Sequence, residues 1–312
     1  MVTVNCQICD SSELEPLYSI HEEGAGYLMS LCRSCKHLQV AGTERTQEQE
    51  QGTYYAALHD NDDELWKKVD AGWGTRRVRA FENILLGLKK LGFGGGRMLD
   101  IGSGFGYMLN MARKRGFEVL GVEPSPLARR LAGQRLGVES VPDVDAIPAE
   151  RSSFDVILCL ETLYYCRDVR EMLLKIRGKL SPAGCFVLKI RANRTALFRL
   201  AAAVSRLRGK FMSLAPGDLL YHYNLRGYHL FTTRNAQRLL KNTGFHIVKT
   251  VNEKGAPVRI TSMSGVLKML RTTVSICVNA ITLGKVKIGT EITIYATPKA
   301  ASDEAIAAAG NA

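Results

Sequence analysis

The pattern of apolar and polar positions changes along the chain, and its second part is the more regular. From residue 97 onward, short apolar runs alternate with segments whose apolar residues recur every three or four positions. The apolar runs predict strands at 97–101, 117–123, 154–160, 185–190, 246–251 and 290–298. The periodic segments predict helices at 106–115, 125–136, 168–180 and 232–245. Alternation of strands and helices indicates βαβ units, so we expect an α/β fold with a mostly parallel sheet.

The chain before residue 97 is organised differently. Its beginning holds too few apolar positions for a core of its own, and a polar stretch follows. Apolar residues at helical spacing then predict a helix over 74–91, which the segment GFGGG ends. We therefore expect a small module at 1–42, a linker with N-terminal helices at 43–91, a main domain at 92–298 and a disordered tail at 299–312.

Two segments interrupt the alternation in the C-terminal third. Residues 194–212 place apolar side chains on one helical face with arginines and a lysine between them, which predicts a basic amphipathic helix. Residues 261–284 are mainly apolar but contain Lys268 and Arg271. We interpret both as basic helical insertions, at about 194–225 and 258–286. They either pack against the sheet, close over a substrate pocket or contact a membrane surface.

Composition and charge indicate the compartment in which the protein works and the class of partner that it binds. The 312 residues are 46% hydrophobic and 23% charged, as in globular proteins. Without a signal-peptide pattern or a long apolar run, we expect a cytoplasmic protein whose only membrane association is peripheral, at the inner membrane. Residues 1–60 hold 3 basic and 9 acidic residues, whereas residues 191–299 hold 18 basic and 3 acidic ones. The basic third favours anionic partners: acidic small molecules, nucleic acid or lipid.

Four of the eight cysteines form two C-x2-C pairs, Cys6 with Cys9 and Cys32 with Cys35. Four thiolates at this spacing suit a tetrahedral zinc ion, and such a closed shell predicts a structural role. Metal binding would supply the stability that the small module lacks. Two disulfides are the alternative, which a reducing compartment disfavours. His37 is a substitute ligand, a neighbour of the ligands or a surface residue.

The stretch MLDIGSGFGYML, residues 98–109, has the order strand, glycine-rich turn, helix. Glycine lets the backbone approach a ligand closely, and a helix N-terminus directs free N–H groups at it. The next strand ends at Glu123, where a carboxylate can accept hydrogen bonds from two ribose hydroxyls. The turn differs from the dinucleotide pattern G-x-G-x-x-G, because Asp100 precedes a G-S-G-F-G sequence. The candidate turn residues are Gly102, Ser103, Gly104 and Gly106.

The ordered motifs LDIGSGFG, GVEPSP, FDVILCLETLYY and LSPAG resemble those of class I S-adenosylmethionine-dependent methyltransferases over residues 95–298. The resemblance implies a Rossmann-like, doubly wound, seven-stranded sheet, mostly parallel, whose last strand is antiparallel. It implies that Asp100 and Gly102–Gly106 hold the methionine end of the cofactor, and that Glu123 holds the ribose. It also places Asp143 or Asp145 near the adenine, and Glu161 at the rim of the pocket.

A C-x2-C…C-x2-C module in front of such a domain resembles a bacterial subgroup that includes nucleotide-sugar, glycan and natural-product methyltransferases. In that subgroup, substrate-side residues follow the fifth strand, where this chain has YHYNLRGYHLFTTRN, residues 221–235. This stretch lacks the glutamate of the sugar C-methyltransferases. A hydroxyl or carbon acceptor must lose a proton, and histidine is the usual base near neutral pH. The candidates are His229, then His222, with Tyr165 standing where many relatives have a histidine.

The leading hypothesis is therefore a methyltransferase that aligns a small-molecule, sugar or glycan/lipid-linked acceptor with the sulfonium methyl group. One alternative is an RNA methyltransferase that uses the basic C-terminal third. Because phosphate contacts need lysine or arginine and the small module is acidic, nucleic acid is the less favoured partner. Another alternative is a non-catalytic scaffold that binds the cofactor.

Overall fold

The structure is a computed structural model that describes residues 5–22, 25–43, 62–72, 75–191, 227–253 and 291–299. Both predicted basic insertions, the candidate base His222 and the predicted tail beyond residue 299 lie outside these ranges.

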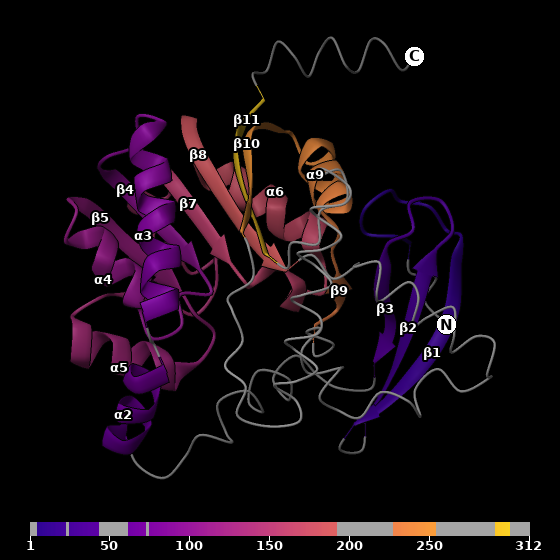
Figure 1. Ribbon diagram of the computed structural model, residues 1–312, viewed down its shortest axis with the longest axis horizontal. Helices are drawn as coiled ribbons and strands as arrows, with labels where there is room; N and C mark the ends of the chain where they lie inside the picture. The colour runs from indigo at the N-terminus through magenta and orange to yellow at the C-terminus, as the bar shows by residue number, and fades with distance from the viewer. Residues whose placement is uncertain are drawn as a thin grey trace, which may run out of the picture.

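A seven-stranded sheet forms the centre of the main domain, in the order β10-β11-β8-β7-β4-β5-β6 (Figure 1). Strand β11 runs antiparallel to β8 and β10, and the other neighbours are parallel. This confirms the expected α/β fold with a mostly parallel seven-stranded sheet. The strands are β4 (Gly96–Ile101), β5 (Phe117–Val122), β6 (Ser140–Val141), β7 (Phe154–Leu160), β8 (Leu180–Arg191), β10 (Phe245–Glu253) and β11 (Glu291–Pro298).

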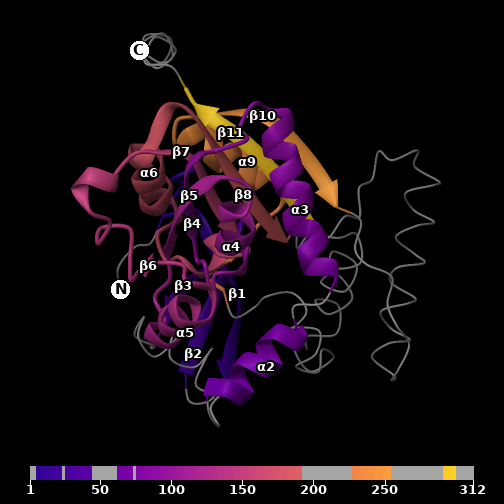
Figure 2. The ribbon, with the colours of Figure 1, turned by 90° about the vertical axis from the view of Figure 1, so that its left-hand side faces the viewer.

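Helices cover both faces of this sheet, with α3, α4 and α5 on one side and α6 and α9 on the other (Figures 1 and 2). Covered faces explain why β7 is an almost continuous apolar run. Side-chain caps begin three of the helices, since Ser125, Asp168 and Thr232 each accept a hydrogen bond from a first-turn N–H group. The helices are α2 (Asp62–Gly72), α3 (Thr75–Lys90), α4 (Tyr107–Arg113), α5 (Pro126–Leu136), α6 (Val169–Lys179) and α9 (Thr233–Asn242).

The sequence pattern predicts that the segment SPAG separates a helix from the strand that follows it. In the structure, SPAG belongs to that strand. Helix α6 ends at Lys179, shortly before SPAG, and the four SPAG residues lie inside β8, which begins at Leu180. Phe154 pairs with Leu180 and Val156 with Cys185, so the four SPAG residues bulge between two paired positions. Apolar periodicity identified only the regular part of the strand.

A second, antiparallel sheet joins the N-terminal module to the main domain. Its order is β1 (Leu14–Glu22), β2 (Ala25–Cys32), β3 (Leu38–Thr43) and β9 (His229–Leu230). Strand β9 comes from the main domain and lies between the module and the large sheet (Figure 1). Cys6, Ile8 and Cys32 share one hydrophobic cluster with Phe231 and Leu239 of the main domain. The module therefore obtains its core from the domain on which it packs.

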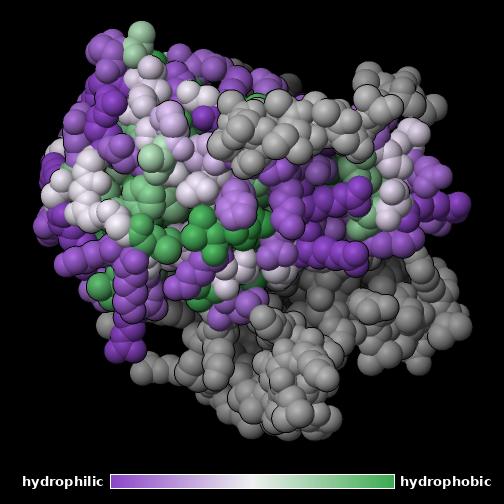
Figure 3. Space-filling model, turned by 90° about the horizontal axis from the view of Figure 1, so that it is seen from above, coloured by the Kyte–Doolittle hydropathy of each residue, from purple (hydrophilic) through white to green (hydrophobic). Residues whose placement is uncertain are grey.

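The two ends of the parallel strands form two opposite edges of the large sheet, and these edges carry different side chains. Figure 3 views the edge where the parallel strands begin, and hydrophilic side chains there surround a small hydrophobic area. The predicted cofactor residues follow β4, β5, β6 and β7, and so belong to the opposite edge. Within the described ranges, no helix is long and apolar enough to cross a membrane.

Candidate active site and cysteine cluster

The glycine-rich turn links β4 to α4 at the carboxyl edge of the sheet, beside the position where the strand order reverses between β4 and β7. Gly102, Gly104 and Gly106 have φ values of 77°, 53° and 76°, in the region that favours glycine. A Cβ atom on Gly102 would lie 2.2 Å from Thr162 Oγ1. The turn therefore requires glycine both for its backbone conformation and for space.

Glu123, directly after β5, is buried against this turn. Its Oε2 accepts a hydrogen bond from Gly104 N at 2.8 Å, and its Oε1 accepts one from Ser125 N at 2.9 Å. Burial raises the pKa of Glu123, and these two amide bonds oppose that rise. Since each carboxylate oxygen has two lone pairs, the fixed carboxylate can still accept hydrogen bonds from a pair of hydroxyl groups.

Asp100 lies in β4, just before the turn, and its exposed fraction is 3%. Its Oδ1 has no hydrogen-bond partner among the described residues. Burial and the nearby charge of Glu123 raise the pKa of Asp100 to about 8. A cationic group placed here would satisfy the free oxygen and stabilise the ionised form. The site therefore fits the ammonium group at the methionine end of S-adenosylmethionine.

Asp143 and Asp145 follow β6, and both are exposed. Asp143 Oδ1 accepts a hydrogen bond from Ala146 N at 2.8 Å, which closes a turn. Asp145 instead forms an ion pair with Lys175 Nζ at 2.6 Å. Ser103, the remaining turn residue, lies 3.1 Å from Ser140 through their Oγ atoms, and this contact ties the turn to β6.

Glu161, the first residue after β7, adopts an unusual backbone conformation with φ of 58°. A non-glycine residue in this region is strained, and such strain is concentrated at functional sites. Its Oε2 accepts a hydrogen bond from Tyr164 OH at 3.0 Å and pairs with Arg191 Nε at 3.2 Å. Its Oε1 has no partner in the described part of the chain, and burial raises its pKa. Thr162, the next residue, packs against Gly102, so Glu161 lies beside the glycine turn.

The candidate catalytic residues lie in different surroundings. Tyr165 is 40% exposed, and its ring contacts that of Tyr164 edge-on at 4.6 Å between centroids. His229 is buried, its Nδ1 lies 3.2 Å from His37 Nε2, and its Nε2 lies 3.2 Å from Arg167 O. Burial lowers the pKa of His229 to about 4. These contacts indicate a structural histidine, and the expected role as base remains a prediction that they do not support.

Helix α2, which lies within the predicted stretch of N-terminal helices, packs beside the glycine turn, a position that its apolar pattern does not predict. Leu65 packs with Phe105 of the glycine turn, and Trp66 stacks on Tyr107 at 5.5 Å between ring centroids. Tyr107 OH also donates a hydrogen bond to Asp70 at 2.9 Å. The signal for this helix was a first turn rich in acidic residues followed by apolar positions.

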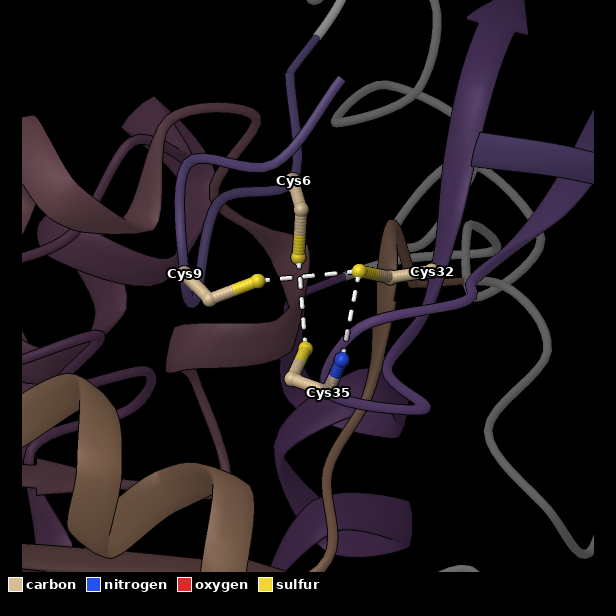
Figure 4. A group of neighbouring side chains, drawn as sticks. All are labelled: Cys6, Cys9, Cys32 and Cys35. Atoms are coloured by element: carbon tan, nitrogen blue, oxygen red, sulfur yellow. Dashed lines mark hydrogen bonds between the residues drawn. The ribbon is translucent and has the colours of Figure 1, made fainter. Parts of the chain in front are cut away.

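The four cysteines of the N-terminal module come together from two loops. Their Sγ atoms all lie within 4.8 Å of one another and point to a common centre (Figure 4). The Sγ atoms of Cys6 and Cys35 are 3.5 Å apart, and those of Cys9 and Cys32 are 3.6 Å apart. A disulfide needs about 2.05 Å, so the four thiols are free. The donor set and its shape fit a structural zinc ion.

The two cysteine loops have matching backbones. Asp10 N donates to Cys6 O at 2.8 Å, and Lys36 N donates to Cys32 O at 2.9 Å. Asp10 and Lys36 have φ values of 62° and 60°, each directly after the second cysteine of its pair. Both loops thus make the same tight turn, which presents two sulfur atoms to one centre. His37 lies outside this ligand group and is buried, so of the three alternatives for it only that of a neighbour of the ligands agrees with the structure.

The chain is similar to known methyltransferases in sequence and in fold. A family model described as "Methyltransferase domain" matches residues 72–250, more than half of the chain. The "Ubiquinone biosynthesis O-methyltransferase" of Acinetobacter baumannii (strain AYE) is 30% identical over 168 residues, 50% of this chain and 69% of that protein. The "tRNA U34 carboxymethyltransferase" of Desulforapulum autotrophicum is 36% identical over 101 residues, 30% of this chain and 31% of that protein.

Among solved structures, a candidate sarcosine dimethylglycine methyltransferase from Galdieria sulphuraria matches with a TM-score of 0.50. The alignment covers 80% of this chain and 98% of that chain at 13% identity. At this identity the likeness shows a shared fold.

Substituting Gly102 by alanine is expected to destabilise the protein by about 2 to 4 kcal/mol, because strain and a steric clash with Thr162 coincide. Gly116→Ala is the matched control, since Gly116 has φ of 89° but open space around its Cβ position. Gly94→Ala, with open space and no such φ, is the second control. Urea unfolding should show the largest loss of stability for the Gly102 variant, a smaller loss for the Gly116 variant and the smallest loss for the Gly94 variant. Equal losses of stability for the Gly102 and Gly116 variants would contradict the steric clash.

The raised pKa of Asp100 predicts that, without cofactor, the free energy of unfolding falls as the pH rises. An unfolded aspartate loses its proton near pH 3.8, whereas the folded chain keeps it until about pH 8. The folded state therefore binds more protons between these values, and stability falls as pH rises through them. Asp100→Asn should remove this loss, so its gain in melting temperature grows with pH. A gain that is constant across pH, or equal for the exposed control Asp143→Asn, would refute this account.

A structural zinc site predicts that the native protein carries the mass of one zinc ion and that loss of a ligand releases this ion. Native mass spectrometry should show one zinc ion per chain, and Cys9→Ser should release it and lower the melting temperature. Cys166→Ala, outside the cluster, serves as the control and should retain the ion. A native mass without zinc, or full zinc retention by Cys9→Ser, would rule out a four-thiolate site.

Proposed function

This chain belongs to the methyltransferase-domain family and is an S-adenosylmethionine-dependent methyltransferase, and we propose that it methylates a small-molecule, sugar or glycan-linked acceptor at the carboxyl edge of the large sheet. One observation carries this proposal above the others. Glu123, held by the glycine-turn amide of Gly104, and the free carboxylate oxygen of Asp100 meet at the edge where the strand order reverses.

The described residues suggest how the cofactor lies. We assign the ribose hydroxyls to Glu123 and the methionine end to Asp100 and the turn Gly102–Gly106. For the adenine we favour Asp143 over Asp145, because the carboxylate of Asp145 is already paired with Lys175. When bound, the cofactor supplies an activated methyl group, so the protein has to align the acceptor with it.

Glu161 is our candidate for the group that receives the acceptor's proton. Its Oε1 lacks a described partner, and its pKa is raised towards the range that suits a base. It lies beside the glycine turn because Thr162 packs on Gly102. Arg191 and Tyr164 hold the other oxygen, which fixes the orientation of the carboxylate. The Acinetobacter relative is named as an O-methyltransferase, which supports a hydroxyl acceptor for this chain.

An RNA acceptor is the second candidate. The Desulforapulum relative is named as a tRNA enzyme, and residues 191–299 are strongly basic. That relative is matched over less than a third of its length, and the N-terminal module is acidic. Small molecules therefore remain the favoured class.

Cofactor binding and methyl transfer test the proposal separately. Calorimetry should show that the protein binds S-adenosylhomocysteine and that Glu123→Gln weakens binding by about tenfold or more, since hydrogen bonds to a charged group are worth about 1.5 to 3 kcal/mol. Glu139→Gln, which alters a carboxylate paired with Arg151 at the surface, should bind as the wild type does. Equal affinity of the Glu123 and Glu139 variants would overturn the ribose assignment.

For the acceptor, methyl-labelled S-adenosylmethionine is incubated with either a small-molecule extract or total tRNA. Label entering the extract supports the proposal, and label entering tRNA alone favours the second candidate. Glu161→Gln should retain S-adenosylhomocysteine binding and transfer methyl groups about a hundredfold more slowly, as expected for loss of a base. Unchanged transfer by this variant would remove Glu161 from the reaction.

A further inference from the structure

We propose that the cysteine module positions the rim of the active site through two buried histidines, His37 and His229. The part of the molecule that they position is the rim loop, which we define as residues 161–168, between β7 and α6. This inference rests on the proposed function only where it identifies the rim loop as part of the active site. The histidine contacts themselves are independent of which acceptor is methylated.

On the module side, His37 is fixed by the cysteine loop. Cys32 N donates a hydrogen bond to His37 O at 2.8 Å, and Lys36, between Cys35 and His37, makes the tight turn of that loop. The imidazole of His37 stacks on that of His229, with 5.5 Å between centroids and 17° between planes. A loop held by the cysteine cluster therefore sets the place of His37.

The protonation of the pair follows from its partners. The backbone carbonyl of Arg167 can only accept, so His229 Nε2 carries a proton and donates to it. Burial keeps the His229 ring neutral, and its Nδ1 is then an acceptor. His37 Nε2 must donate to that Nδ1, at 3.2 Å. The result is a directional chain of hydrogen bonds from the module to the rim loop.

On the main-domain side, the segment around β9 holds the rim loop at two further points. Tyr228 N donates to Tyr164 O at 2.7 Å, and Arg167 Nε donates to Tyr228 OH at 2.8 Å. The backbone also approaches closely at Gly227, where a Cβ atom would lie 2.7 Å from Tyr164 O. Tyr164 and Arg167 of the rim loop are thus attached to a strand that pairs with the N-terminal module.

The rim loop carries Glu161, which we propose as the base. Tyr164 OH donates to Glu161 Oε2, and Thr162 packs against Gly102 of the cofactor turn. A displacement of Tyr164 or Arg167 would therefore move the Glu161 carboxylate.

The polar chemistry of His37 and His229 indicates that the pair positions the module against the main domain and does not only fill space. Phe231 packs against both histidines, with its ring centroid 5.6 Å from that of His37 and 5.8 Å from that of His229. Apolar side chains would fill this space without the cost of burying polar groups. A buried hydrogen bond adds direction, because it is satisfied in only one relative placement of its two partners. His37 and His229 are 192 residues apart in sequence, so their bond fixes the module against the main domain.

Two substitutions at His37 separate the hydrogen bond from the packing. His37→Phe keeps an aromatic ring but loses the donor, whereas His37→Gln places an amide N–H near the position of Nε2. Hydrogen exchange of the full-length protein should show rim-loop amides exchanging about tenfold faster in His37→Phe, with protection restored in His37→Gln. Amides of β5 and α5, zinc content and S-adenosylhomocysteine affinity should stay as in the wild type.

Two results would overturn the proposal. Unchanged rim-loop exchange in folded His37→Phe would show that the hydrogen bond positions nothing, and faster exchange throughout the protein would show a general loss of stability. If His37→Phe fails to fold, His229→Gln replaces it, since this variant loses the contact with His37 but can still reach Arg167 O. A wild-type protein that binds no S-adenosylhomocysteine would contradict the proposed function while leaving the rim-loop measurement valid.

Discussion

The candidate active site depends on the parallel pairing of β4 with both β5 and β7. Because β4 is central and its neighbours run in the same direction, three carboxyl ends meet at one edge. Asp100 lies at the end of β4, Glu123 follows β5, and Glu161 follows β7. A slip in register of one residue would turn Asp100 towards the other face of the sheet and separate it from the glycine turn.

This arrangement gathers the buried carboxylates of Asp100 and Glu123 and the partly buried carboxylate of Glu161, all with raised pKa values, which is a cost to the folded chain. The structure offsets the cost unevenly. Glu123 is held by two backbone amides, and one oxygen of Glu161 is held by Arg191 and Tyr164. The other oxygen of Glu161 and one oxygen of Asp100 have no described partner. Asp100 lies next to the glycine turn, where a cationic ligand group would complete the hydrogen bonding of its carboxylate.

The N-terminal module is part of the same construction and not an appended unit. Its sheet takes β9 from the main domain, its cysteine loops share a hydrophobic cluster with α9, and Asn242 Nδ2 donates to Ile8 O at 3.0 Å. The four cysteine Sγ atoms of this module lie around one centre. The chain returns to the small sheet at β9, before β10 and β11 complete the large sheet.

The sequence by itself determined the features that arise locally. Apolar runs identified the parallel strands β4, β5, β7 and the regular part of β8, but not the two-residue strand β6. The glycine turn was evident from consecutive residues, and the spacing of Cys6, Cys9, Cys32 and Cys35 predicted their convergence. Each of these depends on residues a few positions apart or on a ligand geometry that fixes the spacing.

Only the tertiary structure decided which distant surfaces meet. Strand β9 has only two residues, too few for any periodic pattern, and its pairing with β3 places His229 against His37. The bulge that absorbs SPAG exists because Phe154 and Leu180 pair across it. The partner of Asp145 is similarly distant, because Lys175 lies thirty positions further along the chain. Partners of this kind depend on how whole elements pack, because the free energy that selects them comes from burial and hydrogen bonds between distant segments.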